Sequence, residues 1–262
     1  MTDALVIARD EGPVRWLTLN TPHNRNALGA PLVAALRAEL DAAARSDARC
    51  IAITGAGKVF SAGADLRALQ ELAARPREEN VADARLLADL FEAIALHPLP
   101  VIAAMNGHAL AGGAGLALAC DLTLAVEGSA LGFTEVRVGF VPAVILNFLL
   151  RTAGEKVLRD LCLTGRRLSV EEASALGFVN LVVPPGALEG AVAEYGTAFA
   201  EASPQAIALT KRLFTELRPL PLSEGLRVAA EANADARASA DCKEGVAAFL
   251  EKREPRWTRQ GQ

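Results

Sequence analysis

Strand-like and helix-like segments alternate along about the first 185 residues of the chain, which is the pattern of an α/β domain. Strands are predicted where short runs are apolar or alternate in polarity, at residues 14–20, 50–54, 101–105 and 122–126, with a further short strand near residues 5–8. Helical spacing is seen where Leu32, Leu36 and Leu40 recur after Pro31 in a first-turn position. Further helices are predicted at residues 65–72 and 80–96.

The pattern changes after Ser203 and Pro204, where the strand-like runs stop. Three helical stretches follow, near residues 205–217, 222–236 and 241–252. We therefore predict two regions, an α/β domain over residues 1–200 and a helical region over residues 201–262.

Composition argues against several classes of protein. The 262 residues carry a net charge of -4, from 27 basic and 31 acidic residues, and show no basic stripe, which disfavours nucleic acid as a partner. No apolar run reaches the roughly 18 residues of a membrane span. The N-terminus does not resemble an export signal, and the four cysteines form no CxxC pair, so we expect a cytoplasmic protein. The three histidines lack metal-ligand spacing, and no metal site is expected.

Two clusters of small residues each follow a predicted strand and open a helix, at residues 55–66 and 107–116. The N-terminus of a helix offers unpaired N–H groups to an anion, and small side chains let a ligand approach the backbone. Glycine inside a helix costs about 1 kcal/mol relative to alanine. Three glycines between Gly112 and Gly115 therefore favour a binding loop, with tight helix packing as the alternative.

Three longer motifs together resemble the enoyl-CoA hydratase/isomerase (crotonase) family. They are S-A-G-A-D-L at residues 61–66, A-L-A-G-G-A-G-L-A-L-A-C-D-L at residues 109–122 and G-F-T-E-V-R-V-G-F-V-P at residues 132–142. Shorter segments at residues 24–28, 163–166 and 175–180 also fit, so the resemblance covers nearly the whole chain. It implies a crotonase-like spiral of ββα units, followed by a C-terminal helical region that builds homotrimers or hexamers made of two trimers.

The resemblance also implies a site for an acyl-CoA thioester. The thioester oxygen would accept hydrogen bonds from the backbone N–H groups of Ala64 and Gly112, while Glu135 would exchange a proton with the substrate. Apolar neighbours of Glu135 in the sequence are expected to raise its pKa by burial. The residues expected to bind coenzyme A are Ala62, Asp65, Leu66 and Gly113, together with Phe249 and Lys252 from a neighbouring subunit. No cofactor is expected, because coenzyme A enters as part of the substrate.

One position departs from the family pattern. Hydratases of the family place a second glutamate three residues after the glycine of the oxyanion site, where this chain has Gly115. The first hypothesis is an enoyl-CoA hydratase in which Glu135 works alone, adding water across the 2,3 double bond. The alternatives are a 3-enoyl to 2-enoyl-CoA isomerase with a single glutamate, and a non-catalytic acyl-CoA-binding scaffold. A replacement base from elsewhere is a further possibility, with these acidic residues as candidates: Glu71, Glu78, Glu79 and Asp83.

Overall fold

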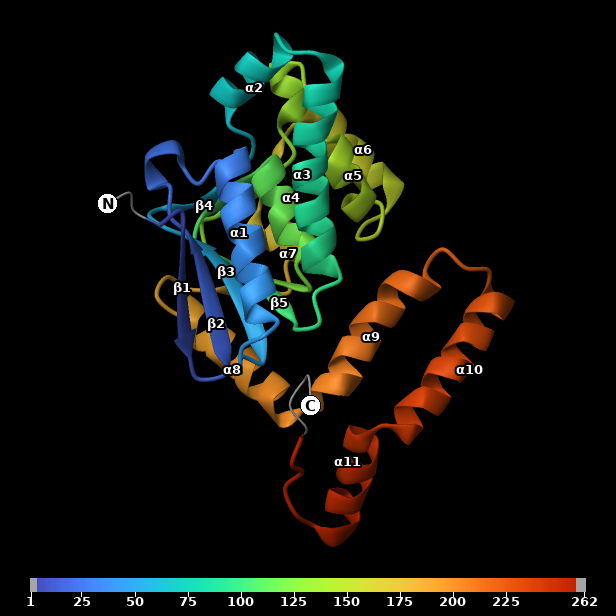
Figure 1. The fold of residues 1–262 in the computed structure, drawn as a ribbon. Coiled ribbons are helices and arrows are strands. Elements are labelled where there is room, and N and C mark those ends of the chain that lie inside the picture. Colours follow the sequence, from blue (N-terminus) through green and yellow to red (C-terminus); the bar gives the residue numbers. More distant parts are fainter. Residues whose placement is uncertain (1–3, 258–262) are drawn as a thin grey trace.

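Six strands form the larger of two sheets, in the order β1, β2, β3, β5, β7 and β10, in a computed structural model that describes residues 4–257 (Figure 1). Their bounds are Val6–Glu11, Val14–Leu19, Cys50–Gly55, Val101–Met105, Leu122–Val126 and Leu181–Val183. β1 pairs antiparallel with β2, and the remaining pairs are parallel. The strands predicted from apolar runs are all confirmed.

The smaller sheet has four strands of three residues each, in the order β4, β6, β8 and β9. They span Val59–Ser61, His108–Leu110, Ala130–Gly132 and Arg167–Ser169. β4, β6 and β8 each follow a strand of the larger sheet along the chain, and a helix comes after each pair. This repeat confirms the predicted spiral of ββα units, although strands this short show no periodicity of their own in the sequence.

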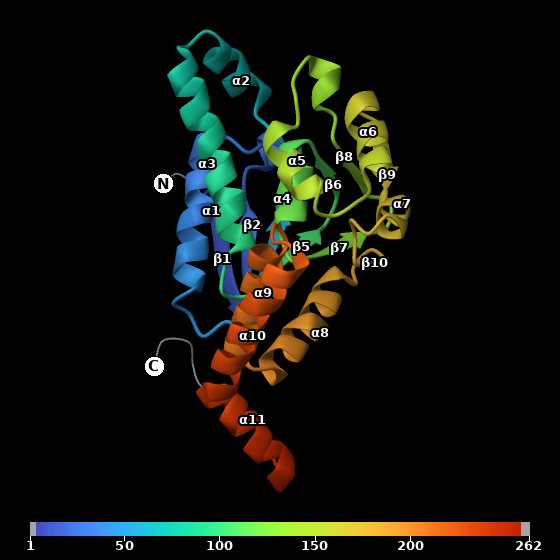
Figure 2. The same cartoon turned by 90° about the vertical axis from the view of Figure 1, so that its right-hand side faces the viewer.

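Helices cover both faces of the larger sheet (Figure 2). The helices of the first 201 residues are α1 Ala30–Ala43, α2 Leu66–Ala73, α3 Arg77–Ala95, α4 Gly112–Ala119, α5 Ala143–Leu149, α6 Glu155–Thr164, α7 Val170–Ala175 and α8 Leu188–Glu201, with 3-10 turns η1 Pro22–Asn24 and η2 Glu135–Val138. One face packs Leu17, Ile53 and their neighbours under α1, α3 and α4. The other face packs Trp16 and Ala52 against Val192 of α8. Both faces are therefore apolar, which explains the continuous apolar runs of the parallel strands.

The chain ends in three helices, α9 Pro204–Leu217, α10 Leu222–Ala238 and α11 Ala240–Glu251, as the helical spacing predicts. α9 lies beside the α/β body, while α10 and α11 extend away from it (Figures 1 and 2). The predicted boundary near residue 200 falls at the end of α8. Within residues 4–257, no helix combines the length and the apolar character needed to cross a membrane.

Candidate active site

The first glycine-rich loop is held by the segment that precedes α1. The Ala62 N–H donates to the Arg25 carbonyl at 3.0 Å, and the Leu28 N–H donates to the Gly63 carbonyl at 2.7 Å. Gly63 has a φ of +90°, a left-handed conformation that glycine adopts without strain. Within residues 4–257, the N–H of the following residue, Ala64, donates no hydrogen bond to the protein. Ala64 therefore presents a free backbone donor.

The side chain of Asn26 holds the first part of this loop in place by hydrogen bonds. Its side chain is fully buried, and its Nδ2 donates to the carbonyls of Ala56, Val59 and Phe60 at 2.9 to 3.2 Å. The Asn26 carbonyl in turn accepts a hydrogen bond from the Ser61 hydroxyl at 2.8 Å. Sequence reasoning missed this role. The only signal was that Asn26 lies in a segment that fits the family, because a buried asparagine with several backbone partners cannot be recognised from its neighbours.

The second loop ends in Ala111, which immediately precedes α4. Ala111 has φ 48° and ψ -123°, a conformation that costs a non-glycine residue on the order of 1–3 kcal/mol. Its N–H donates to the Gly132 carbonyl of β8 at 2.7 Å, which holds the turn in place. Gly112 is the first residue of α4, where N–H groups have no acceptor inside the helix. Within residues 4–257, the Gly112 N–H donates no hydrogen bond to the protein.

The two loops touch. A Cβ atom built on Gly63 would lie 2.8 Å from the Gly112 nitrogen and 2.6 Å from the Leu110 carbonyl oxygen, so no side chain fits there. A Cβ atom built on Gly112 would lie 3.6 Å from the Ala64 nitrogen. The two free N–H groups therefore belong to backbone segments in direct contact. Their binding to a thioester oxygen stays a prediction.

Glu135 begins η2, three residues after the β8 residue that accepts the Ala111 hydrogen bond. Its side chain is only 6% exposed, and its Oε2 has no hydrogen-bond partner among the described residues. Burial raises the pKa of this carboxyl, as the sequence predicts. Burial likewise raises the pKa of the Cys162 thiol to about 11, with a smaller contribution from the negative charge of Glu135. Glu135 is thus a desolvated carboxyl with an unpartnered oxygen, and its catalytic role stays a prediction.

The space beside Gly115 is filled. A Cβ atom built there would lie 2.7 Å from Ile145 Cγ1 and 3.0 Å from Phe91 Cε2. Both side chains are buried. Among the candidate replacement bases, Glu71, Glu78 and Glu79 are exposed and Asp83 is half-buried, and a role for any of them stays a prediction.

Known proteins of one family match nearly the whole chain. The enoyl-CoA hydratase/isomerase family model matches residues 9–260. A Thermus thermophilus protein named "Putative enoyl-CoA hydratase" is 45% identical over 250 residues, covering 95% of this chain and 98% of that protein. The chain belongs to the enoyl-CoA hydratase/isomerase family.

Solved structures of the family share the whole fold. The crystal structure of an enoyl-CoA hydratase from Polaromonas sp. JS666 has a TM-score of 0.92 at 31% identity, covering 97% of this chain and 99% of that chain. The structure of human enoyl coenzyme A hydratase domain-containing protein 3 has a TM-score of 0.91 at 31% identity, covering 97% of this chain and all of that one. The family acts on acyl-CoA substrates, so the loop junction is the candidate site for a thioester.

The residues expected to bind coenzyme A lie in three places, on the first loop, in α4 and on α11. Asp65 caps α2, where its carboxylate accepts from the Arg67 and Ala68 N–H groups at 3.0 and 3.4 Å. Ala62 is half-buried and Leu66 is 58% exposed, so this edge of the loop is open.

Gly113, Phe249 and Lys252 are placed differently. Gly113 is buried, and a Cβ atom there would overlap the Ser61 carbonyl oxygen, so close packing explains this glycine. Phe249 is 83% exposed on α11, and Lys252 ends that helix. α11 lies at the opposite end of the molecule from α2, so one chain by itself does not bring these two residues to the loops (Figure 1). The coenzyme-binding roles of all six residues stay predictions.

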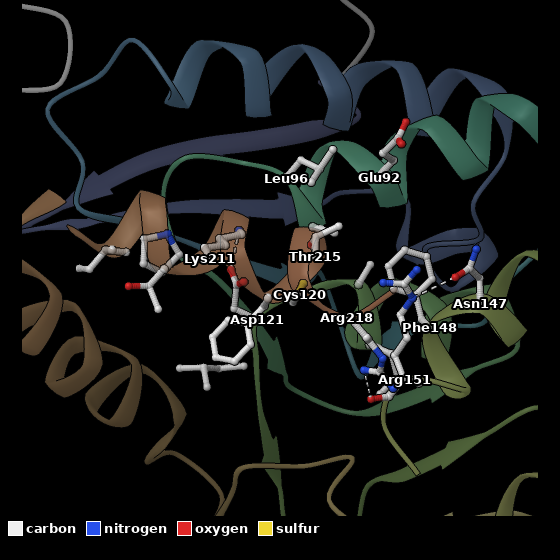
Figure 3. Close-up of a pocket in the computed structure, with 18 of the residues that line it drawn as sticks. Glu92, Leu96, Cys120, Asp121, Asn147, Phe148, Arg151, Lys211, Thr215 and Arg218 are labelled. Atoms are coloured by element: carbon white, nitrogen blue, oxygen red, sulfur yellow. Dashed lines mark hydrogen bonds and ion pairs between the residues drawn. The ribbon is translucent and has the colours of Figure 1, made fainter. Parts of the chain in front are cut away.

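A cavity of about 1040 Å³ lies at the other end of α4, bounded by α3, α5 and α9 (Figure 3). Cys120 and Asp121 line it directly after α4, and Phe148 and Phe214 contribute aromatic rings. The eight residues of α4 span about 12 Å, and the residues of the loop junction do not line this cavity. The cavity is therefore separate from the candidate active site.

Proposed function

We propose that the protein is an enoyl-CoA hydratase in which Glu135 is the only general acid and base. The observation that carries this proposal is the buried Glu135 carboxyl, whose Oε2 has no hydrogen-bond partner among the described residues, three residues after the Gly132 carbonyl that accepts the Ala111 N–H of the second loop. A mere binding protein would have no need of a desolvated carboxyl, since burying it without a partner destabilises the fold.

The proposed reaction balances with one carboxylate. Glu135 accepts a proton from water as the water oxygen bonds to C3 of the 2-enoyl thioester. The C2–C3 π electrons shift toward C1, and the thioester oxygen takes up the negative charge. The carbonyl then re-forms as Glu135 returns the proton to C2, which places both additions on one face and restores the carboxylate.

The Ala64 and Gly112 N–H groups would stabilise the charge on the thioester oxygen. Preorganised donors of this kind contribute about 2.7–4 kcal/mol each in acyl-transfer enzymes. Their position is determined by Gly63 and by the Ala111 turn, so substitutions that add bulk at Gly63 or Gly112 should displace them. Backbone donors cannot be removed by changing their own side chains.

A second candidate is a 3-enoyl to 2-enoyl-CoA isomerase. It is favoured by the apolar packing of Ile145 and Phe91 beside Gly115, which leaves no second carboxylate to activate water. Here Glu135 would take a proton from C2 of the 3-enoyl thioester and return it to C4, while the double bond moves from C3–C4 to C2–C3. One carboxylate is sufficient for both steps.

Two ultraviolet assays separate these functions. Hydration of a short 2-enoyl-CoA removes the absorbance of the conjugated thioester, and isomerisation of a 3-enoyl-CoA creates it. Glu135→Gln should lower the faster of the two rates at least about 100-fold, the lower range for general acid–base catalysis. The control is Glu127→Gln, because Glu127 is exposed in the loop after β7.

A Glu135→Gln protein with near wild-type rates would exclude Glu135 from the mechanism. Absence of both activities in the wild-type protein, together with tight binding of coenzyme A by calorimetry, would instead favour the non-catalytic scaffold.

We also propose that the chain works as a homotrimer, alone or paired into a hexamer. Large apolar side chains are exposed on the C-terminal helices, with Phe214 at 77%, Leu222 at 79% and Phe249 at 83%. Large exposed apolar side chains on all three of these helices favour surfaces that another protein covers. Association would also allow Phe249 and Lys252 to reach the coenzyme site of a neighbouring subunit.

The four cysteines are unpaired, which supports the expected cytoplasmic location.

A further inference from the structure

Gly115 lies on the same face of α4 as Gly112, because residues three apart in a helix are neighbours. The rise between them is about 4.5 Å. Whatever packs against Gly115 therefore lies within about one helical turn of a free N–H group of the loop junction. The side chains in that position are Ile145 of α5 and Phe91 of α3.

These two side chains form a rigid apolar plug. Ile145 is 3% exposed and Phe91 is fully buried. Phe91 also packs edge-on against Phe148 of α5, with ring centroids 5.9 Å apart. Three helices thus meet beside Gly115, and the plug occupies the space that a longer side chain at that position would need.

We propose that Ile145 is a specificity-determining residue, which together with Phe91 excludes water and any second acid–base group from the Gly115 side of the thioester. This inference rests on the proposed function of Glu135. Hydration needs a group that orients and deprotonates water, whereas isomerisation needs only a shuttle between two carbons. The plug therefore limits hydration more than isomerisation, and its removal changes the ratio of the two rates.

The packing is tested first by a double-mutant cycle. Gly115→Ala places a methyl group 2.7 Å from Ile145 Cγ1, so we expect the melting temperature to fall by roughly 3 °C or more. Ile145→Ala removes the obstructing atom, and the double variant should lose clearly less stability than the sum of the single variants. Strict additivity, or a Gly115→Ala protein as stable as the wild type, would overturn the packing claim.

The reaction outcome is tested with Gly115→Glu/Ile145→Ala, which removes the Ile145 part of the plug and adds a carboxylate. The matched control is Gly115→Gln/Ile145→Ala, with the same shape and no acid–base group. The ratio of 2-enoyl-CoA hydration to 3-enoyl-CoA isomerisation should rise at least about tenfold in the glutamate variant over its glutamine control. A folded glutamate variant with an unchanged ratio would overturn the inference.

Ile145→Ala alone provides a test that does not depend on accommodating a new charge. Isomerisation in deuterium oxide should incorporate at least about twofold more solvent deuterium at C4 than the wild type, because additional water then reaches the carboxyl from the Gly115 side between the two proton transfers. Equal incorporation would contradict the exclusion of water. Failure of this inference alone leaves the wild type active and dependent on Glu135. Failure of the proposed function leaves the wild type either inactive with both substrates or active without dependence on Glu135, and it overturns both proposals.

Discussion

At the scale of single residues, Glu135 shows how a site can conflict with stability. Its carboxyl is buried with an oxygen that no described residue satisfies, so the charged form is disfavoured relative to the unfolded chain. The group nevertheless must lose and gain a proton to act as an acid and a base. A raised pKa brings it closer to the neutral range in which such exchange is fast.

The raised pKa predicts a change in stability with pH. In the folded state Glu135 binds a proton more tightly than in the unfolded state, so its contribution becomes unfavourable as the pH rises above the usual glutamate range. Glu135→Gln should therefore raise the melting temperature at pH 7–8, by roughly 2–4 °C for each kcal/mol gained, and leave it unchanged near pH 4. Thermal melts of both proteins across this range test the prediction, and a lower melting temperature of the variant at neutral pH would contradict it.

At the scale of elements, a buried lysine helps to anchor α9 to the α/β body. Lys211 is buried, and its Nζ contacts Asp121 Oδ2 at 2.6 Å and donates to the carbonyls of Ile94 and Leu99 at 3.0 and 3.1 Å. Asp121 also accepts from the Val101 N–H at 2.7 Å. The same lysine therefore links α9 to the end of α3, to the following loop and to the second residue after α4.

Removing this cation should loosen α9. We expect Lys211→Met to lower the free energy of unfolding by about 2–4 kcal/mol, somewhat less than for a fully buried pair, because the Asp121 side chain keeps 29% of its surface exposed. The double variant Asp121→Asn/Lys211→Met should recover part of the loss, since it leaves no unpaired charge. Urea unfolding measures both, and a double variant less stable than Lys211→Met would contradict the charge argument.

At the scale of the whole molecule, a single chain leaves an apolar cavity and apolar helices uncovered. The cavity between α3, α5 and α9 is lined by Phe148 and by the exposed Phe214 (Figure 3). Arg218 closes one end by donating to the carbonyls of Leu150 and Arg151 at 3.1 and 2.6 Å. Self-association would cover this surface and shield the Lys211–Asp121 pair.

The proposed assembly makes a prediction for Phe214. The wild-type protein should have a mass near three or six times 27.4 kDa by light scattering, and Phe214→Asp should shift it toward the monomer. A charge that must be buried in an interface disfavours association by several kcal/mol. The control is Leu163→Asp, an equally exposed apolar position on α6, away from the cavity. A wild-type monomer, or a fully assembled Phe214→Asp protein, would contradict the proposal.

Much of the secondary structure could be predicted because it is encoded locally. The spacing of Leu32, Leu36 and Leu40 predicts α1, and the apolar run from residue 101 predicts β5. The smaller sheet could not be predicted this way, because three residues are too few to show a period. The burial of Lys211 was equally invisible, since a lysine on a helix is ordinarily exposed and only α9 packing against Asp121 makes it otherwise.

Some features of the candidate site could likewise be predicted from the sequence, and others could not. The sequence alone determined two glycine-rich strand-to-helix loops and an acidic residue among apolar neighbours, because backbone freedom and local polarity belong to the residues themselves. The family resemblance then related the two loops to one thioester. Only the tertiary structure decided that Gly63 touches Gly112, that Ile145 fills the space beside Gly115 and that Glu135 has a free buried oxygen. Each of these depends on contacts between residues far apart in the chain, and such contacts exist only once the whole core has packed.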